Sequence, residues 1–434
     1  MVVPKIVIDG VFFQISQRSG IARVWRHLLQ AWQQQGRAAQ VWLIDRGGTL
    51  PCLGDYPVLT LPLYDYRKSP QDAEALQALC DQVQADLFLS TYYTTPLTTP
   101  SVFLAHDMIP EVIGMDLAEP CWREKRYSIL YASRHIAISH NTAKDLVYFY
   151  PHLRRGDIPV VHCGVSEWCR PVSAAEIQQF RQTYGLQRPF VLLLGERRGG
   201  KDYKNAVTFF RALALATNPW EFDVLCVGGE AALEPELASL PLSCPVHLLR
   251  LDDADLRVAY GAAIALIYPS RYEGFGLPVL EAMACGCPVI LGNHSSLPEV
   301  AGAAGYTIDV MDPAAWLTAV QAVQDPAKRQ CLIRRGLDHA PHFSWSTMAN
   351  SLWAILDQTV QALQRGDCSP PSPLWLDWRQ QEQKLAALTQ AEAQRQQEAT
   401  TLRAQITSLQ TELTAIKSSR LWRVKTFFDK AKFW

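Results

Sequence analysis

The chain has 434 residues, enough for two or three domains, and its 48% hydrophobic and 19% charged residues exclude a mainly disordered protein. The 41 basic residues are balanced by 42 acidic ones, so the net charge of −1 argues against a nucleic-acid-binding surface spread over the whole chain. No run of 18 apolar residues is present, which excludes a membrane-spanning helix.

The N-terminal segment and the cysteines indicate the compartment. The apolar run from Met1 to Phe13 contains Lys5 and Asp9, which is typical of a first strand rather than a signal peptide. The 11 cysteines are scattered, and only Cys285 and Cys287 lie close together. We therefore predict a reduced, cytoplasmic protein without a zinc site.

The first half of the chain alternates short β-rich runs with helical patterns such as Ile21–Gln35 and Asp72–Ala85. Apolar strands that alternate with helices are typical of a parallel sheet covered on both faces, an α/β fold. The predicted strands are Lys5–Asp9, Gln40–Asp45, Asp86–Ser90, Val102–His106, His135–Ser139 and Ile158–His162.

The same pattern then starts again, which predicts a second doubly wound domain and a cleft that faces the carboxyl ends of both sheets. We place the boundary between Gly164 and Gln187, which gives domains at 1–165 and 166–342. The predicted strands are Phe190–Gly195, Phe222–Gly228, Val246–Arg250, Ile264–Pro269 and Pro288–Leu291.

The globular part is predicted to end with a helix at 343–365, which we expect to pack back on the N-terminal domain, followed by a Pro-rich linker at 366–375. The segment 376–418 then has a 3-4 spacing of seam positions from 385 to 416, apolar at both ends and interrupted by Glu392 and Arg395. This spacing predicts a coiled coil and a homo-oligomer; a single solvated helix that packs back on its own domain is the alternative.

The tail at 419–434 is both basic and aromatic. In the last 18 residues six cations oppose only Asp429, and five aromatic residues lie among them. Such a helix suits the surface of an anionic membrane, whereas a dimer contact or a frayed end is the alternative. Nucleic acid is a weaker option because the patch is small. The cations are Lys417, Arg420, Arg423, Lys425, Lys430 and Lys432, and the aromatic residues are Trp422, Phe427, Phe428, Phe433 and Trp434.

The stretch from Tyr268 to Ile290 carries the most chemistry. A strand is followed by a loop with Glu273, Gly274 and Gly276. Pro278 suits the first turn of the next helix, and we place Glu281 in that same first turn. A helix N-terminus attracts phosphate, and each carboxylate can accept hydrogen bonds from a pair of sugar hydroxyls. The pattern therefore fits a nucleotide sugar; a capped surface helix with two solvated glutamates is the alternative.

Glu273-x7-Glu281, inside Pro-Ser-Arg-Tyr-Glu-Gly-Phe-Gly-Leu-Pro-Val-Leu-Glu-Ala, resembles the signature of the family 4 retaining glycosyltransferases, and the resemblance continues through Ser295–Gly302. It implies the GT-B fold, two Rossmann-like domains around a cleft. By this resemblance Glu273 contacts hydroxyls of the donor sugar and Glu281 the ribose diol. The backbone N–H groups of Gly274, Phe275, Gly276 and Leu277 then face the sugar and phosphates.

A second candidate site is Gly195-Glu-Arg-Arg-Gly-Gly-Lys-Asp-Tyr-Lys-Asn205. It approximates a P-loop, but Asp202 replaces the hydroxyl residue that binds magnesium, so we reject a P-loop kinase. The family resemblance assigns an Arg and a Lys here to the leaving diphosphate. Arg197 and Lys204 fit these roles, with Arg198 and Lys201 as alternatives. A solvated cationic turn without a binding role is the other interpretation of this segment.

Four further segments complete the candidates. His106 corresponds by resemblance to a histidine that contacts the donor sugar, and a structural histidine is the alternative. Gly20 corresponds to a loop that meets phosphate or acceptor. Arg23, in the same segment, fits the surface of a helix equally well. His162–Val165 resembles the interdomain stretch. Asp253-Ala-Asp255 has the form of a metal-binding pair, but helix capping explains it at least as well.

The resemblance implies a retaining sugar transfer from a nucleotide sugar, with GDP-mannose slightly favoured, to a glycan or lipid-linked glycan, without a metal or another cofactor. We expect the specificity contacts in the loops Tyr92–Thr99 and Glu111–Tyr127. A nucleotide-sugar epimerase and a non-catalytic coiled-coil scaffold remain as alternatives. A dehydrogenase is disfavoured because no Gly-x-Gly-x-x-Gly follows the first strand.

Overall fold

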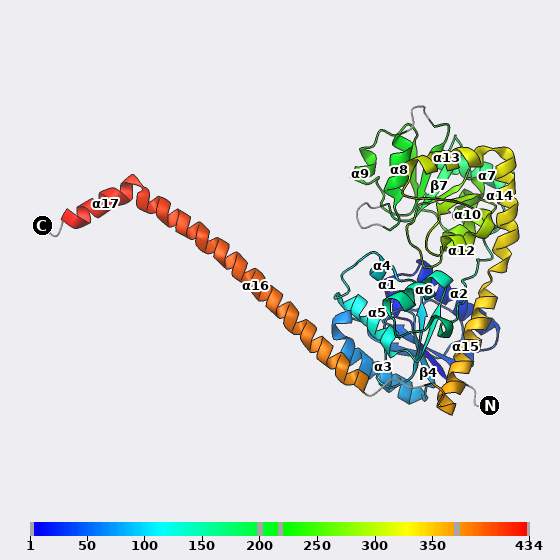
Figure 1. Cartoon of the computed structure of the whole chain (residues 1–434), viewed down its shortest axis with the longest axis horizontal. Helices are drawn as coiled ribbons and strands as arrows, with labels where there is room; N and C mark the ends of the chain where they lie inside the picture. Colours follow the sequence, from blue (N-terminus) through cyan, green and yellow to red (C-terminus); the bar gives the residue numbers. More distant parts are fainter. Residues whose placement is uncertain (1–3, 198–202, 216–219, 369–373, 432–434) are drawn as a thin grey trace. The chain divides into compact units, whose positions relative to one another are not determined.

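The computed structural model describes residues 4–197, 203–215, 220–368 and 374–431 (Figure 1). The chain divides into two compact units, Met1–Ser372 and Pro373–Trp434. The first unit contains two six-stranded sheets, and the second unit contains two helices.

All neighbouring strands in both sheets are parallel, which confirms the predicted pair of doubly wound domains. The first sheet consists of β1 (Ile6–Asp9), β2 (Val41–Arg46), β3 (Val58–Leu61), β4 (Leu87–Ser90), β5 (Ser101–Ala105) and β6 (Arg134–Ala137). The second consists of β7 (Phe190–Leu194), β8 (Asp223–Val227), β9 (Val246–Leu249), β10 (Leu266–Tyr268), β11 (Val289–Gly292) and β12 (Gly305–Ile308). Their strand orders are β3-β2-β1-β4-β5-β6 and β12-β11-β10-β7-β8-β9.

Three strand assignments differ from the sequence prediction. The predicted strand Ile158–His162 is only a single bridge between Ala137 and Val160. The edge strands β3 and β12 were missed, because an edge strand is partly exposed and lacks the continuous apolar run of a central strand.

The first unit also contains fifteen α-helices among its described residues, and they follow the strands in the expected alternation. They are α1 (Val11–Ile15), α2 (Gly20–Gln34), α3 (Ser69–Val83), α4 (Ile109–Val112), α5 (Pro120–Tyr131), α6 (His140–Phe149), α7 (Ala174–Tyr184), α8 (Ala206–Ala214), α9 (Pro235–Ala238), α10 (Asp253–Ala262), α11 (Leu277–Ala284), α12 (Leu297–Ala301), α13 (Pro313–Gln324), α14 (Pro326–His339) and α15 (Trp345–Arg365). Because α5 starts at Pro120, the stretch Glu111–Tyr127 is partly helical rather than a loop.

Both faces of the sheets carry apolar side chains, since successive side chains of a strand point to opposite faces. In the second sheet, Leu192 and Leu225 belong to one apolar core, whereas Val191 and Val224 belong to another. Helices therefore pack on both faces, which explains why the strands are apolar throughout (Figure 1).

The chain returns to the first domain through α15, which lies beside α2 (Figure 1). The indole Nε1 of Trp32 donates a hydrogen bond to the carbonyl of Ala349 at 2.9 Å, and Trp32 packs edge-on against Trp353. This contact ties the C-terminal end of the first unit to its N-terminal sheet.

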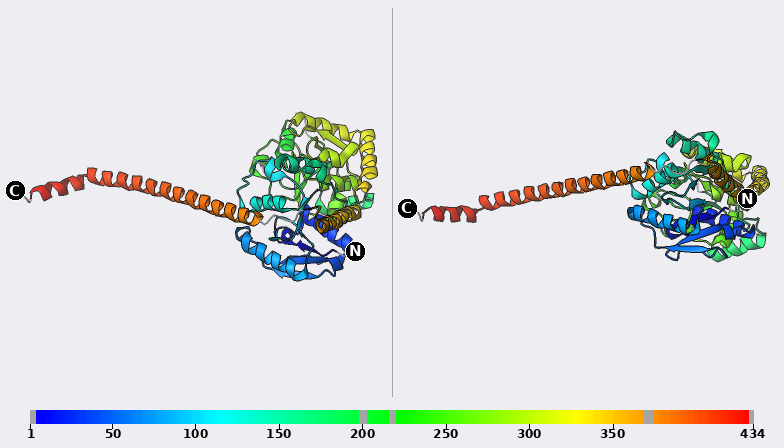
Figure 2. Two further views of the ribbon diagram at one scale, coloured as in Figure 1. Left: turned by 60° about the horizontal axis from the view of Figure 1, so that its bottom comes forward. Right: turned by 90° about the horizontal axis from the view of Figure 1, so that it is seen from below.

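The second unit consists of α16 (Leu374–Ser418) and α17 (Arg420–Ala431). Figure 2 shows α16 as one continuous helix. Within the described residues, no helix of the chain combines the length and the apolar character needed to cross a membrane.

Candidate functional site

The candidate site lies at the carboxyl ends of β7 and β10, where the strand order of the second sheet reverses. The chain runs from β7 to β8 and β9 on one side, and β10 pairs with β7 on the other. Ligands of open α/β sheets bind at such a switch point because the two following loops diverge. The loops after β7 and β10 are the two that the sequence singled out.

Glu273 lies in the loop after β10 and is 8% exposed. Its Oε1 accepts a hydrogen bond from the Tyr268 hydroxyl at 2.9 Å and pairs with Lys204 Nζ at 2.6 Å. Ser295 and Ser296 hold the backbone of the loop: the Glu273 N–H donates to Ser295 Oγ, and Ser296 Oγ donates to the carbonyls of Glu273 and Phe275. The carboxylate is therefore held in one place by both its side chain and its backbone.

Lys204 approaches Glu273 from the loop after β7. Burial alone lowers the pKa of the Lys204 ammonium, but the Glu273 carboxylate and two tyrosines outweigh burial and raise it well above its usual value. Lys204 is thus a fixed cation at the switch point. The structure brings together Glu273 and Lys204, which are 69 residues apart in the sequence.

Glu281 lies inside α11, in its second turn rather than the predicted first turn, and is 3% exposed. Burial raises the pKa of its carboxyl group, whereas Arg23 and the Tyr260 hydroxyl lower it. Arg23, from α2 of the first domain, pairs with Glu281 and, at 3.0 Å, with Asp253. Arg23 is therefore an interdomain ion-pair residue and not a simple helix-surface residue.

Arg197 does not face open space in this structure, although the sequence favoured it for the diphosphate. Its side chain is fully buried, and its guanidinium donates to the carbonyls of Gly228 at 2.6 Å and Glu230 at 2.7 Å and pairs with Glu234 at 3.1 Å. Arg197 thus holds the loop after β8 in place. The alternatives Arg198 and Lys201, together with Asp202, lie outside the described residues.

A cavity of about 390 Å³ opens next to this loop. Gly229 has to be a glycine here, because its φ is 71° and a Cβ would lie 2.8 Å from the Arg197 guanidinium. The cavity is lined by the loops after β7, β8 and β9 and by Arg18 of the first domain: Arg18, Glu196, Val227, Gly228, Gly229, Glu230, Glu234, Arg250 and Leu251. It therefore lies between the two domains.

The glycine-rich loop that was predicted to face a donor is mainly an interdomain contact. A Cβ on Gly274 would come within 1.8 Å of the His106 carbonyl, and the Gly274 carbonyl accepts hydrogen bonds from the hydroxyls of Ser139 and Thr142. The Phe275 ring is buried against His162 and Phe343. These two positions are thus explained by the close approach of the first domain.

Gly276 and Leu277 form the start of α11. Gly276 has φ 106° and precedes the helix, and Pro278 lies in its first turn as predicted. A Cβ on Gly20, the first residue of α2, would lie 3.7 Å from Leu277. Gly20 and the N-terminus of α11 therefore face each other across the two domains.

His106 follows β5 at the carboxyl end of this strand and is 8% exposed. Among the described residues, neither of its ring nitrogens has a hydrogen-bond partner. Burial and the nearby Lys125 ammonium lower the pKa of the imidazole to about 3, so the ring is neutral. A neutral imidazole offers one donor and one acceptor, which a ligand hydroxyl can satisfy.

The Asp-x-Asp element is accounted for by protein contacts. Asp252 caps α10 by accepting a hydrogen bond from the Asp255 N–H at 2.9 Å, Asp253 pairs with Arg23, and Asp255 accepts from the Tyr184 hydroxyl. The capping interpretation is confirmed for Asp252, whereas Asp253 and Asp255 lie in the first turn of the helix.

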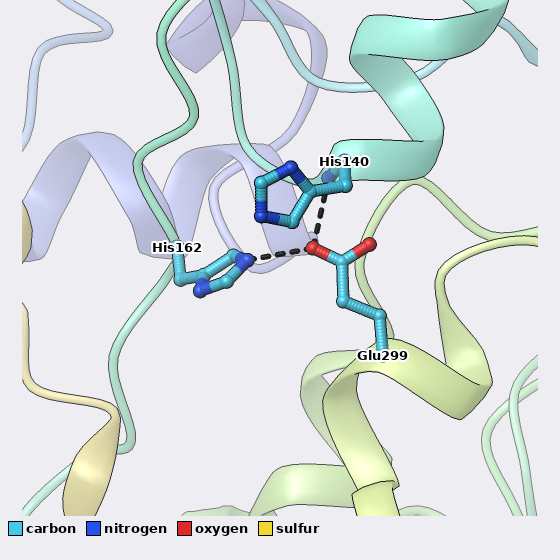
Figure 3. Close-up of side chains that lie close together, drawn as sticks. All are labelled: His140, His162 and Glu299. Atoms are coloured by element: carbon cyan, nitrogen blue, oxygen red, sulfur yellow. Dashed lines mark hydrogen bonds and ion pairs between the residues drawn. The ribbon is translucent and has the colours of Figure 1, made fainter.

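A second cluster, His140, His162 and Glu299, contains residue types that bind metals (Figure 3). Its geometry is that of a helix cap: Glu299 accepts hydrogen bonds from the backbone N–H groups of His140 at 2.8 Å and Asn141 at 3.2 Å. His162 Nε2 lies 2.6 Å from Glu299 Oε1. These bonds lower the pKa of Glu299 against the effect of burial and join α12 of the second domain to α6 of the first.

Sequence reasoning missed three features of the site: the cavity lining after β8 and β9, the role of Arg23, and the cap made by Glu299. The paired glycines Gly228 and Gly229 after a strand were a usable signal for the cavity. The two interdomain contacts had none, because their partners are separated by 258 and 159 residues.

Comparison with known proteins agrees with this fold. Residues 188–325 match the family model "Glycosyl transferases group 1", and residues 18–167 match the model "Glycosyltransferase Family 4". The structure resembles that of WaaG, a glycosyltransferase involved in lipopolysaccharide biosynthesis, with a TM-score of 0.63, 14% identity and coverage of 81% of this chain and 99% of that one. It also resembles sucrose-phosphate synthase from Thermosynechococcus elongatus, with a TM-score of 0.64, 20% identity and coverage of 83% and 100%. At these identities the likeness shows the fold.

Two curated relatives come from Escherichia coli. O-antigen chain mannosyltransferase B is 35% identical over 188 residues, which are 40% of this chain and 48% of the relative. The serotype-specific mannosyltransferase WbdA is 27% identical over 313 residues, 67% of this chain and 37% of the relative. The chain thus spans less than half the length of these two relatives. The two matched family models and the paired parallel sheets together identify this chain as a member of the family 4 glycosyltransferases, with the GT-B fold.

Proposed function

We propose that this protein is a retaining glycosyltransferase that moves a sugar from a nucleotide diphosphate sugar to a hydroxyl group of a glycan or a lipid-linked glycan. The Lys204–Glu273 pair at the switch point is the observation that carries the proposal. A diphosphate leaving group needs a fixed cation, and a sugar needs a fixed hydrogen-bond acceptor beside it. Without a ligand, these two opposite charges satisfy each other.

Each remaining site residue has a part in this proposal. Glu281 accepts hydrogen bonds from the ribose hydroxyls, which replace part of its contact with Arg23. The ring nitrogens of His106, which have no hydrogen-bond partner among the described residues, contact a hydroxyl of the donor sugar. Arg18 and Arg250 border the cavity and add positive charge near the phosphates, so the proposal needs no metal and no other cofactor.

Two observations support GDP-mannose as the donor. Both curated relatives named above are called mannosyltransferases. The cavity is also lined by the carboxylates of Glu196 and Glu230. A carboxylate is purely an acceptor, and the guanine edge presents adjacent N–H donors, whereas uracil presents a single one.

The nucleotide can be tested directly by thermal unfolding with GDP, UDP and ADP and their sugars. A ligand at one hundred times its dissociation constant stabilises the folded chain by about 2.7 kcal/mol. We expect the largest shift with GDP and GDP-mannose. A product that forms only when a glycan acceptor is present supports transfer, a product without acceptor supports an epimerase, and the absence of any shift contradicts a nucleotide site.

We also propose that α17 binds the inner surface of an anionic membrane. Its Trp422, Val424 and Phe427 side chains are exposed beside Arg423 and Lys425, and aromatic and basic groups together favour the lipid interface. We expect the full chain to sediment with vesicles that contain phosphatidylglycerol and much less with pure phosphatidylcholine. Equal binding to both, or to neither, contradicts the proposal.

A further inference from the structure

The helix α16 presents a row of large apolar side chains to solvent, which is interrupted between Leu388 and Leu402. It is 45 residues long, and seven of its leucines and isoleucines are between 49% and 68% exposed. Removal of such side chains from water is favourable, so these residues favour association. The seven residues are Leu385, Leu388, Leu402, Ile406, Leu409, Leu413 and Ile416.

In the C-terminal half of this helix the charges lie along the edges of the row. With Leu385 as position a of a heptad, the apolar residues occupy positions a and d. From 396 to 418 the helix has four charged residues, and all of them lie at positions e and g next to the row: Glu398, Arg403, Glu412 and Lys417. A solvated helix would carry charges at the outer positions b, c and f, which are all uncharged in this segment.

The signs of these charges select one orientation of a second copy. In a parallel, in-register coiled coil, position g of one helix meets position e of the other five residues later. Glu398 then faces an arginine, residue 403 of the second copy, and Glu412 faces a lysine, residue 417. Both contacts pair opposite charges.

Other arrangements lose these pairs. In an antiparallel pair, g meets g and e meets e, so glutamate faces glutamate and the basic residues face each other. A parallel shift by one heptad brings Glu398 opposite a glutamine. Within a single helix, residues five apart do not meet, because neighbours on a helix surface are three or four apart.

We infer that α16 forms a parallel, in-register coiled coil with a second copy of this chain, and that the Glu398–Arg403 and Glu412–Lys417 pairs set its orientation and register. Glu392 and Arg395 interrupt the seam and cost stability in its first half, which leaves 399–416 as the stable part. Parallel pairing also brings both copies of α17 to the same end of the coiled coil. Two weak surface contacts then act together, since the second forms within an already bound complex.

Three variants of the full-length chain test orientation and register, with association measured by sedimentation equilibrium at about 0.1 M salt. We expect Glu412→Lys to weaken self-association by roughly tenfold, because lysine then faces lysine in both copies. Lys417→Glu has the same effect, and the double variant Glu412→Lys/Lys417→Glu restores the wild-type dissociation constant. Thr411→Lys, at outer position f, is the matched control and leaves association unchanged.

Three outcomes would overturn the inference. We expect a dissociation constant of about 1 µM. A wild-type chain that is still monomeric at about 50 µM, roughly 50 times that constant, excludes the coiled coil. Stronger association of Glu412→Lys indicates an antiparallel pair, in which that lysine faces a glutamate. A double variant that stays weak shows that residues 412 and 417 do not meet. None of these measurements depends on the proposed sugar transfer.

Discussion

Replacement of Glu273 by glutamine is expected to reduce sugar transfer by roughly 10²–10³-fold while the chain stays folded. The amide keeps the shape of the side chain but loses the charge that pairs with Lys204 and accepts from the Tyr268 hydroxyl. It therefore binds a sugar hydroxyl less strongly, and it leaves the Lys204 ammonium without its counter-charge. Initial rates with saturating donor and acceptor measure the effect on turnover.

The control for Glu273→Gln is Glu236→Gln in the same domain. Glu236 pairs with Arg211 at 2.9 Å, but both side chains are about half exposed, so this loss should leave activity within about twofold. A second comparison uses Lys204→Met. We expect the double variant Glu273→Gln/Lys204→Met to regain stability relative to the single variants, because no charge is left unpaired, but to remain inactive. A Glu273→Gln enzyme with near wild-type turnover would refute the assigned role.

Replacement of Arg23 by methionine is expected to shift the pH dependence of nucleotide binding to higher pH. Burial raises the pKa of Glu281, and Arg23 is the largest influence that lowers it again. Without Arg23 the pKa of Glu281 rises further, so this carboxyl group takes up a proton as the pH falls and can no longer accept two ribose hydroxyls. As the pH falls, the affinity of the variant should therefore begin to decrease at a higher pH than the affinity of the wild type.

Isothermal titration with GDP at three pH values measures this effect. Glu281→Gln is the reference: it should bind about 10–100-fold more weakly than the wild type at every pH, because one charge-assisted contact is lost. Arg37→Met, in the turn that follows the helix of Arg23, is the control: Arg37 contacts Trp353 and Asn350 and not Glu281, so this variant should behave as the wild type. A pH-independent Arg23→Met variant would show that Arg23 does not hold Glu281 in its charged form.

The alternation of apolar runs and helical patterns predicted most of the fold. Ten of the strands lie close to their predicted positions. Eight of them are central parallel strands, which are buried on both faces and therefore apolar, and the edge strands β6 and β9 were found as well. The edge strands β3 and β12 escaped this signal, since several of their side chains are exposed. The helix α11 also followed from local chemistry, as Pro278 suits its first turn and Gly286 ends it with φ 75°.

The sequence by itself determined which segments stand out: the Glu273–Glu281 loop and helix and the basic turn that ends at Lys204, to which we assign the chemistry, and the heptads of α16. These signals are local, so spacing along the chain is enough to reveal them. Only the tertiary structure decided which charges meet. It paired Lys204 with Glu273 and Arg23 with Glu281, and it turned Arg197 inward to hold the loop after β8. The Arg23–Glu281 contact depends on how the two domains dock, and the other two depend on which loops meet at the carboxyl ends of the second sheet. Partners 31 to 258 residues apart leave no periodic trace of such contacts in a single sequence.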